Sequence, residues 1–273
     1  MVSVIIPTYN RGWVLREAID SVLAQDFRDF ELIVVDDGST DNTGQILDSY
    51  HQDLMGIRQP NTGVSAARNR GIAAAAGQLL AFLDSDDLWL PRKLSSQVNF
   101  FNSNPDAVIN QTEEIWIRNG VRVNPKTRHH KLSGMIFEPS LALCLVSPSA
   151  VMMKRTLFDE VGLFDEDLPA CEDYDLWLRV SWRYPVHLIE TPLIIKRGGH
   201  ADQLSKAPGL DKFRIQALKK VIESGQLEQA SYRAAVRTLQ EKCTIVAGGC
   251  RKRGKDAEAL YYEELAIRMG QSA

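Results

Sequence analysis

The amino-terminal third of the chain alternates short apolar runs with segments of helical periodicity, and this alternation limits the fold more than any other feature. Four apolar runs predict buried strands: 2–6, 30–35, a short run near Ile57, and 79–83. Three intervening segments place apolar residues at helical spacing: 14–23, 43–50 and 64–76. Pro7 is expected to end the first strand. The alternation predicts right-handed crossovers, and therefore an α/β fold with a mixed, mostly parallel sheet flanked by helices.

Polar loops follow three of the predicted strands, at 7–10, 36–41 and 84–87. Because the carboxyl ends of parallel strands meet at one edge of a sheet, we expect these loops to converge on a crevice of nucleotide size. Gly-x-Gly-x-x-Gly does not follow the first strand, and the chain has no Gly-Lys-Ser/Thr sequence. The crevice is therefore predicted to be neither the common dinucleotide-binding site nor a P-loop.

Three carboxylates, Asp84, Asp86 and Asp87, follow directly on the strand predicted at 79–83. Carboxylates gathered at a strand end need a cation, and hard oxygen ligands without clustered cysteine or histidine suit Mg²⁺ or Mn²⁺. Asp84 and Asp86 are therefore candidate metal ligands. The alternative for these residues alone is an acidic turn that caps a helix beginning near Pro91.

Aromatic and basic residues accompany these loops. Tyr9 offers an aromatic face to a nucleotide base, or alternatively packs as a half-buried residue. Arg68 and Arg70, on the helix predicted at 64–76, are placed to reach the crevice, or alternatively are solvated like most helix arginines. The residue types alone leave both alternatives open.

Four ordered motifs together resemble those of family two glycosyltransferases, which have the GT-A fold. They lie at 4–10 (VIIPTYN), 31–41 (ELIVVDDGSTD), 63–69 (GVSAARN) and 82–87 (FLDSDD). The resemblance implies a Rossmann-like GT-A sheet and inverting transfer of a sugar from a nucleotide-diphospho-sugar, most commonly a UDP-sugar, to an acceptor hydroxyl. It also implies bound Mn²⁺ or Mg²⁺, and a glycan or lipid-linked acceptor in bacterial surface polysaccharide or glycolipid synthesis.

The resemblance assigns roles to the nucleotide-binding residues. By the family pattern, Pro7 and Tyr9 line the base pocket. Asp37, with Asp36 adjacent, hydrogen-bonds the base, and Arg68 helps to hold the nucleotide.

The family pattern also assigns the metal side of the crevice. Asp84 faces the ribose and the metal, and Asp86 is the direct metal ligand. His200 follows two glycines, which permit close approach to a diphosphate, and resembles a late histidine that some members use as a further metal or phosphate contact. A plain surface histidine is the alternative.

The segment 171–179 (CEDYDLWLR) matches the family's catalytic-base motif. Inversion requires a carboxylate on the acceptor side, opposite the departing diphosphate, to take the hydroxyl proton. Asp173 is the predicted base and Glu172 its rival, whereas Asp175 is assigned to the first turn of a helix. The alternative is that all three carboxylates only favour the positive end of that helix.

Helical periodicity replaces strand signals after Pro208, with three apolar faces in 213–222, 232–246 and 260–267. Gly248-Gly249 and Gly254 are expected to separate the last two helices. We therefore expect a GT-A catalytic domain over 1–206 and a carboxyl-terminal helical appendage over 207–273. The basic turn at 251–255 is either an ordinary helix–helix loop or a contact to anionic lipid headgroups.

Composition limits the partners and the location. The net charge of -3 over 273 residues argues against general nucleic-acid binding. The run after Met1 is too short for a signal peptide, which predicts a cytoplasmic protein, with peripheral contact to the inner membrane face left open. Four cysteines without Cys-x-x-Cys spacing predict free thiols. The sequence leaves the oligomeric state open.

A hairpin is expected at Asn119-Gly120, followed by an acceptor-side loop that contains His129 and His130, to which we give no catalytic role. Two function classes then remain, a sugar transferase and a non-catalytic nucleotide-sugar-binding or scaffold protein. Asp84, Asp86 and Asp173 together favour the transferase, because a binding module has no need of a base. A nucleotidyltransferase ranks lowest, since no glycine-rich loop follows the first strand.

Overall fold

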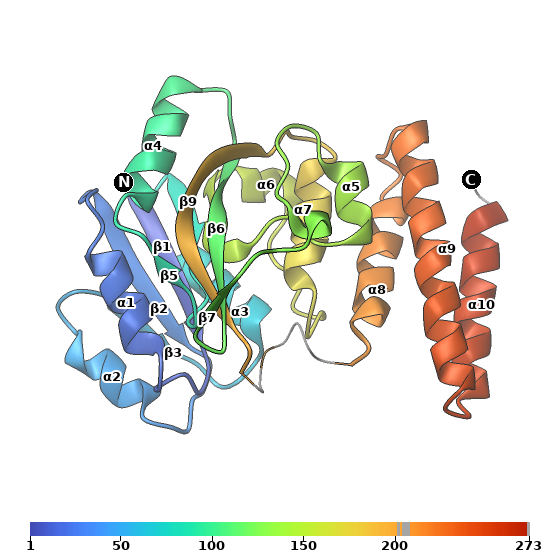
Figure 1. Ribbon diagram of the computed structural model, residues 1–273, viewed down its shortest axis with the longest axis horizontal. Coiled ribbons are helices and arrows are strands. Elements are labelled where there is room, and N and C mark those ends of the chain that lie inside the picture. The colour runs from blue at the N-terminus through green and yellow to red at the C-terminus, as the bar shows by residue number, and fades with distance from the viewer. Residues whose placement is uncertain (201–202, 204–207, 272–273) are drawn as a thin grey trace.

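The computed structural model describes residues 1–200, 203 and 208–271 (Figure 1). Its strands form one sheet in the order β3-β2-β1-β4-β8-β6-β9-β5, with β7 paired to β6. The strands are β1 (Val2–Thr8), β2 (Phe30–Asp36), β3 (Met55–Arg58), β4 (Leu79–Phe82), β5 (Leu88–Trp89), β6 (Ile109–Arg118), β7 (Val121–Val123), β8 (Val151–Lys154) and β9 (His187–Gly198).

The sheet is mixed, as the sequence predicts. β1 pairs in parallel with β2 and β4, and β2 with β3, while β8 is antiparallel to both β4 and β6. β6 therefore runs in the same direction as β4, and β9 is parallel to β6. The carboxyl ends of β1, β2, β4, β6 and β9 consequently lie at the same edge of the sheet.

Helices cover both faces of the sheet (Figure 1). They are α1 (Leu15–Leu23), α2 (Thr43–Ser49), α3 (Val64–Ala74), α4 (Lys93–Ser103), α5 (Phe137–Ala142), α6 (Leu157–Val161) and α7 (Glu172–Ser181). Buried residues of α1, α2 and α4 form a core with one face of β1, and those of α3, α6 and α7 form a core with the other. The alternation of Val4, Ile5 and Ile6 between these two cores follows from the two-residue period of a strand.

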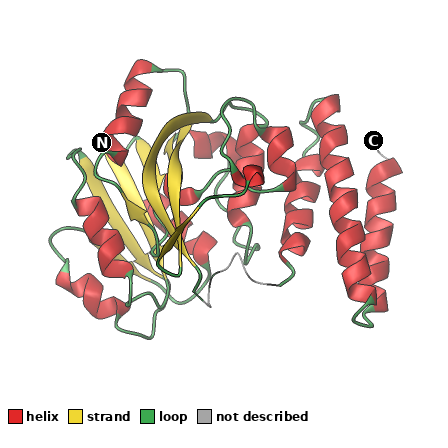
Figure 2. Ribbon diagram, in the orientation of Figure 1, coloured by secondary structure: helices red, strands yellow, loops and turns green. Residues whose placement is uncertain are grey.

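Only helices follow β9 among the described residues, as Figure 2 shows. They are α8 (Leu210–Glu223), α9 (Gln229–Arg251) and α10 (Asp256–Gln271). Their buried residues form a third core together with Phe137 and Leu141 of α5 and Tyr174 and Leu178 of α7. The carboxyl-terminal helices thus pack directly on the helix that carries the predicted base.

Two local predictions were wrong. β1 does not end before Pro7 but continues to Thr8. The backbone oxygen of Thr8 points toward β2, where it accepts a hydrogen bond from Asp37 N at 2.9 Å. Because successive residues of a strand direct their backbone groups to opposite neighbours, the backbone of Pro7 points toward β4. The register with β4 ends at Ile5, and the missing N–H of Pro7 therefore breaks no ladder hydrogen bond.

The second wrong prediction concerns Gly248 and Gly249, which do not separate two helices but lie inside α9. A glycine in a helix interior costs only about 1 kcal/mol relative to alanine. The neighbouring Ala247 and Cys250 are buried in the third core, and their packing stabilises this part of the helix. The turn to α10 is made at Gly254, which has a φ of 68°.

All four cysteines are free thiols. The expected hairpin joins β6 to β7, and Asn119 and Gly120 both have positive φ, as a two-residue hairpin turn requires. None of the described helices combines the length and the apolar character needed to cross a membrane.

Candidate active site at the carboxyl edge of the sheet

The polar loops after β1 and β2 are hydrogen-bonded to each other. Asn10, with a left-handed φ of 51°, donates its backbone N–H to Ser39 Oγ, and its side-chain oxygen accepts from Thr40 N, both at 2.8 Å. Pro7, in β1, is buried. Tyr9, which follows β1 at the carboxyl edge of the sheet, is 45% exposed. The aromatic ring of Tyr9 is therefore available to a ligand.

Asp37 is buried, and both of its carboxylate oxygens accept hydrogen bonds from the loop that precedes α3. The donors are Gln59 Nε2 at 2.8 Å, Thr62 N at 3.0 Å and Gly63 N at 2.8 Å. Gly38 permits this close approach, since its φ is 78° and a Cβ there would lie 2.7 Å from Asn61 N. The structure therefore gives Asp37 a role in shaping the loop.

Asp36 is also buried, but its side chain is less occupied. Its Oδ1 accepts from Ser39 N at 2.9 Å, and the described part of the chain supplies no hydrogen bond to Oδ2. Of the two adjacent carboxylates, Asp36 is thus the one with acceptor capacity left for a ligand.

Arg68 is buried and joins the carboxylate loop after β4 to α7. Its Nη1 donates to Glu172 Oε1 at 2.5 Å, and its Nη2 donates to Asp84 Oδ1 at 2.8 Å. The guanidinium also lies over the ring of Phe164 at 5.1 Å. Burial opposes the charged form, but the two carboxylates outweigh it and raise the pKa of Arg68. Arg70, on the same helix, is exposed.

The three carboxylates of 172–175 all lie in the first turn of α7, where the sequence predicted Asp175, but they have different partners. Glu172 pairs with Arg68, and Asp175 pairs with Arg179 at 2.7 Å and Lys220 at 2.8 Å. Asp173 forms no ion pair within the described parts of the chain. It is thus the carboxylate of the three without a direct cationic partner among the described residues.

The side chain of Asp173 is half-buried and held by two weak or local contacts. Its Oδ1 accepts from Tyr174 N at 2.7 Å, and Cys144 Sγ lies 3.7 Å from its Oδ2. Burial, followed by the negative charge of Asp173, raises the pKa of Cys144 well above the ordinary value, so the thiol is the proton donor of this pair.

Asp86 and His200 meet at the same edge, as a shared metal site would require. His200 Nε2 lies 2.8 Å from Asp86 Oδ2. Burial and the charge of Asp84 raise the pKa of Asp86 against the opposing effect of His200 and Arg11. A carboxylate oxygen beside an imidazole nitrogen is a donor set that suits Mn²⁺. No cluster of three or more potential metal-binding side chains occurs within the described residues, so the remaining positions would fall to water or substrate oxygens.

Asp87 has a structural role instead. Its Oδ2 accepts from Ser149 Oγ at 2.7 Å, and its Oδ1 accepts from Arg197 N at 2.9 Å. Burial and the charges of Asp86 and Asp84 raise its pKa. These bonds tie the carboxylate loop after β4 to β9.

The glycines before His200 also permit a contact that the sequence did not predict. Gly199 has a φ of 106°, and a Cβ there would lie 2.1 Å from Asn119 Oδ1. Asn119 N also donates to Gly198 O at 3.0 Å. The glycines thus permit close approach of the β6–β7 hairpin.

A family model supplies the deciding comparison, since the model described as Glycosyl transferase family 2 matches residues 3–162. The chain belongs to glycosyl transferase family 2. An uncharacterized glycosyltransferase of Rickettsia felis is 34% identical over 215 residues, which cover 76% of this chain and 35% of the relative. The chain thus spans about a third of the length of that relative. The Escherichia coli UDP-Glc:alpha-D-GlcNAc-diphosphoundecaprenol beta-1,3-glucosyltransferase WfgD is 31% identical over 182 residues, 66% of this chain and 69% of WfgD.

Solved structures share the fold of this family member. S. aureus TarS 1–349 in complex with UDP-GlcNAc matches with a TM-score of 0.70 at 18% identity, over 98% of this chain and 92% of that one. The mannosyltransferase PcManGT from Pyrobaculum calidifontis, in complex with GDP-Man and Mn2+, matches with a TM-score of 0.61 at 19% identity, over 98% and 84%. The GT-A fold predicted from the four motifs is confirmed.

Sequence reasoning missed a polar cluster around β6 and β9. Lys131 Nζ lies 3.5 Å from Glu114 Oε2 and donates to Gln111 Oε1 at 3.1 Å, and Lys196 Nζ donates to Ser147 Oγ at 3.2 Å. A signal was present, because the sequence Asn-Gln-Thr-Glu-Glu places five consecutive polar residues within β6.

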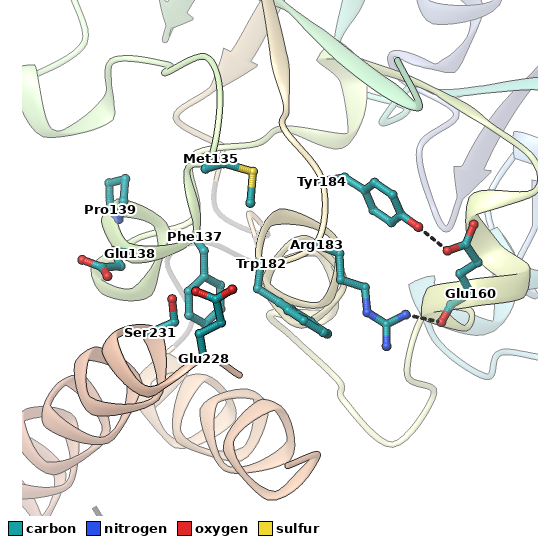
Figure 3. Close-up of a pocket in the computed structure, with 10 residues that line it drawn as sticks. All are labelled: Met135, Phe137, Glu138, Pro139, Glu160, Trp182, Arg183, Tyr184, Glu228 and Ser231. Atoms are coloured by element: carbon teal, nitrogen blue, oxygen red, sulfur yellow. Dashed lines mark hydrogen bonds between the residues drawn. The ribbon is translucent and has the colours of Figure 1, made fainter. Parts of the chain in front are cut away.

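A separate pocket of about 960 Å³ lies between α5, the end of α7 and α9 (Figure 3). In Figure 3, Tyr184 and Arg183 both reach Glu160: the Tyr184 hydroxyl donates to its carboxylate and Arg183 Nη1 to its backbone oxygen at 2.9 Å. None of the site residues predicted from the sequence lines this pocket. The candidate active site is therefore the carboxyl edge of the sheet.

Proposed function

We propose that this family member is an inverting glycosyltransferase that moves a sugar from a nucleotide-diphospho-sugar, a UDP-sugar, to the hydroxyl of a glycan or lipid-linked acceptor. The observation that carries the proposal is the position of Asp173. It is the carboxylate of the α7 turn without a cationic partner among the described residues, on a helix that Arg68 joins to Asp84 on the donor side.

In this proposal each residue has a task that its geometry supports. Asp173 accepts the proton of the acceptor hydroxyl as the hydroxyl oxygen attacks the anomeric carbon. Glu172 is not assigned this task, because its carboxylate is buried and bound to Arg68. Arg68 holds Asp84 in place on the ribose side rather than contacting the nucleotide alone.

The base pocket is proposed to consist of Tyr9 stacked on the nucleobase, with Pro7 behind it and the free oxygen of Asp36 accepting a base N–H. Asp37 supports this pocket through the loop that its carboxylate holds. Exposure of the Tyr9 ring and burial of Pro7 and Asp36 are consistent with this arrangement.

Asp86 and His200, with Asp84 nearby, would hold Mn²⁺ or Mg²⁺. A bound divalent ion would neutralise charge that develops on the leaving diphosphate. The printed complex of PcManGT with GDP-Man and Mn2+ supports a metal in this fold, and the complex of TarS with UDP-GlcNAc supports a nucleotide-sugar donor.

We further propose that residues 1–206 carry catalysis and that 207–273 form a helical appendage docked on α7. The name of WfgD, with its diphosphoundecaprenol-linked acceptor, supports a role in bacterial surface polysaccharide or glycolipid synthesis. Such acceptors fit a cytoplasmic enzyme at the inner face of the membrane, and the basic turn at 251–255 is the candidate membrane contact.

The experiment that tests the proposal compares thermal stabilisation by UDP, GDP, dTDP and CDP, each with Mn²⁺ and with EDTA. We expect UDP with Mn²⁺ to give the largest stabilisation. Stabilisation by another nucleotide would replace UDP as the donor nucleotide. Stabilisation without any sugar transfer from matching donors to glycan or lipid-linked acceptors would favour the scaffold alternative, and no stabilisation at all would refute the donor site.

A further inference from the structure

Residues 115–137 form a strongly cationic part of the chain. They contain Arg118, Arg122, Lys126, Arg128 and Lys131 but no aspartate or glutamate, in a protein with a net charge of -3. The segment comprises the end of β6, the hairpin, β7 and the short helix η1 (Thr127–His129). We call residues 118–131 the cationic segment.

The inner charges near this segment are already neutralised. Lys131 is buried beside Glu114. Burial opposes ionisation of Glu114, but the positive charges of Lys131 and Lys196 outweigh this effect and lower the pKa of Glu114. Burial likewise opposes the charged form of Lys196, but several carboxylates outweigh it and raise its pKa: Glu114, Asp87, Asp84 and Asp173. The charges of Lys131 and Lys196 are therefore already offset by nearby carboxylates.

The outer charges are not balanced in this way. Arg118, Lys126 and Arg128 form no ion pair with a carboxylate in the portion of the chain that the structure describes. Lys126 and Arg128 are exposed, and Arg118 is half-buried. A solvated cluster of like charges has an unfavourable self-energy that an anion would relieve.

Aromatic rings hold these cations in place. The Arg118 guanidinium lies over the Trp116 ring at 5.1 Å, and Trp116 lies against His129 at 5.4 Å. Arg128 Nε donates to His129 Nε2 at 3.2 Å. Burial, then Arg128 and the other nearby cations, lowers the pKa of His129, which keeps the imidazole neutral and able to accept this bond. The two guanidinium groups are therefore preorganised.

The cationic segment borders both halves of the candidate active site. Its hairpin tip contacts the loop of His200 through the bond from Asn119 N to Gly198 O. On the other side, Lys131 and Lys196 act electrostatically on Cys144, whose Sγ lies 3.7 Å from Asp173. Both ends of the segment therefore lie near residues of the candidate active site.

We propose that Arg118, Lys126 and Arg128 bind a phosphate group of the acceptor substrate, next to the hydroxyl that Asp173 deprotonates. The inference rests on the proposed transferase function. Guanidinium groups bind phosphate oxygens in pairs, and lysine adds a point charge. The phosphate belongs either to a lipid diphosphate or to a water-soluble glycan phosphate, and both present the same chemistry to these residues.

The test uses the full chain saturated with UDP and Mn²⁺, so that the donor site is filled. Binding of two probes is measured by calorimetry: farnesyl diphosphate in neutral detergent micelles, and a soluble glycerol phosphate oligomer. We expect at least one probe to bind, and the Arg118→Gln/Lys126→Gln/Arg128→Gln variant to bind it about tenfold or more weakly, with a smaller salt dependence. The probe that binds identifies the source of the phosphate.

The matched control removes three exposed arginines outside this segment instead, in the variant Arg92→Gln/Arg233→Gln/Arg237→Gln. It should bind the probe as the wild type does. Equal losses in both variants, no loss in the first variant, or no binding of either probe to the wild type would overturn the inference. Absence of UDP binding to the wild type would refute the proposed donor site instead, so the two failures are distinguishable.

Discussion

The guanidinium of Arg68 lies 2.5 Å from the carboxylate of Glu172, although the two residues are 104 positions apart in the chain. Arg68 lies on α3, and Glu172 precedes Asp173 in the first turn of α7. This one buried ion pair therefore links α3 to the helix that carries the proposed base.

Breaking that pair should destabilise the protein. Arg68→Met leaves Glu172 buried without its cation, for which we expect a loss of about 3 kcal/mol or more in the free energy of unfolding. Urea denaturation measures the loss. The double variant Arg68→Met/Glu172→Gln should recover part of it, because the uncompensated charge is gone. Strictly additive losses would contradict the coupling.

Replacing the proposed base should abolish transfer without disturbing the donor site. Asp173→Asn keeps the shape of the side chain but removes the proton acceptor, so we expect turnover to fall by roughly 10²- to 10⁴-fold. Stabilisation by UDP with Mn²⁺ should be unchanged. Asp159→Asn, in the first turn of α6, is the matched control and should transfer normally. Normal turnover of Asp173→Asn would remove this residue from the base role.

The metal assignment predicts different effects for two histidines. His200→Ala removes the imidazole beside Asp86 and should weaken the Mn²⁺-dependent part of the UDP stabilisation, while His130→Ala, in the exposed loop, should not. A Mn²⁺ titration at fixed UDP, followed by thermal unfolding, measures the apparent metal affinity of each. EDTA should reduce the wild type to the level of UDP alone. Identical Mn²⁺ titrations for both variants would exclude His200 as a ligand.

Lowering the pH should weaken the buried ion pair of Glu114 and Lys131 and so destabilise the protein. Burial opposes ionisation of Glu114, but Lys131 and Lys196 outweigh it and lower its pKa from 4.5 to about 2. Since the folded pKa is the lower one, this stabilisation is present above pH 4.5 and is lost as the pH falls toward 2. Over that window wild-type stability should fall by at most about 3 kcal/mol more than that of Glu114→Gln. Parallel curves of unfolding free energy against pH would contradict the shift.

Two glycine substitutions test the contact between the β6–β7 hairpin and the His200 loop. Gly199→Ala places a Cβ 2.1 Å from Asn119 Oδ1 as well as straining a φ of 106°, so it should destabilise the protein and reduce transfer. Gly120→Ala meets open space at a φ of 76°, and should cost only the backbone strain, about 1 kcal/mol. Chemical denaturation of the two variants compares these costs, and equal losses would show that the contact is unimportant.

Local patterns predicted the parallel strands, the convergence of the polar loops and the first turn of α7, because strand and helix periods are properties of neighbouring residues. They did not predict that Asp37 is occupied by the 59–63 loop, or that Glu114 meets Lys131. The first depends on how the loop between β3 and α3 returns to the end of β2, and the second on how β6 packs and on its irregular register with β9. Pro7 and Gly248 were misjudged for a related reason, since neighbouring strands and buried contacts outweighed their local preferences.

The sharing of α7 between two cores has a thermodynamic consequence. Leu176 and Trp177 are buried against the sheet, while Tyr174 and Leu178 are buried against α8, α9 and α10. Opening the carboxyl-terminal helices would expose one side of the helix that carries Asp173, so the two parts of the chain should melt in a single cooperative transition. Catalytic competence would then report on the integrity of helices that contain none of the proposed catalytic residues.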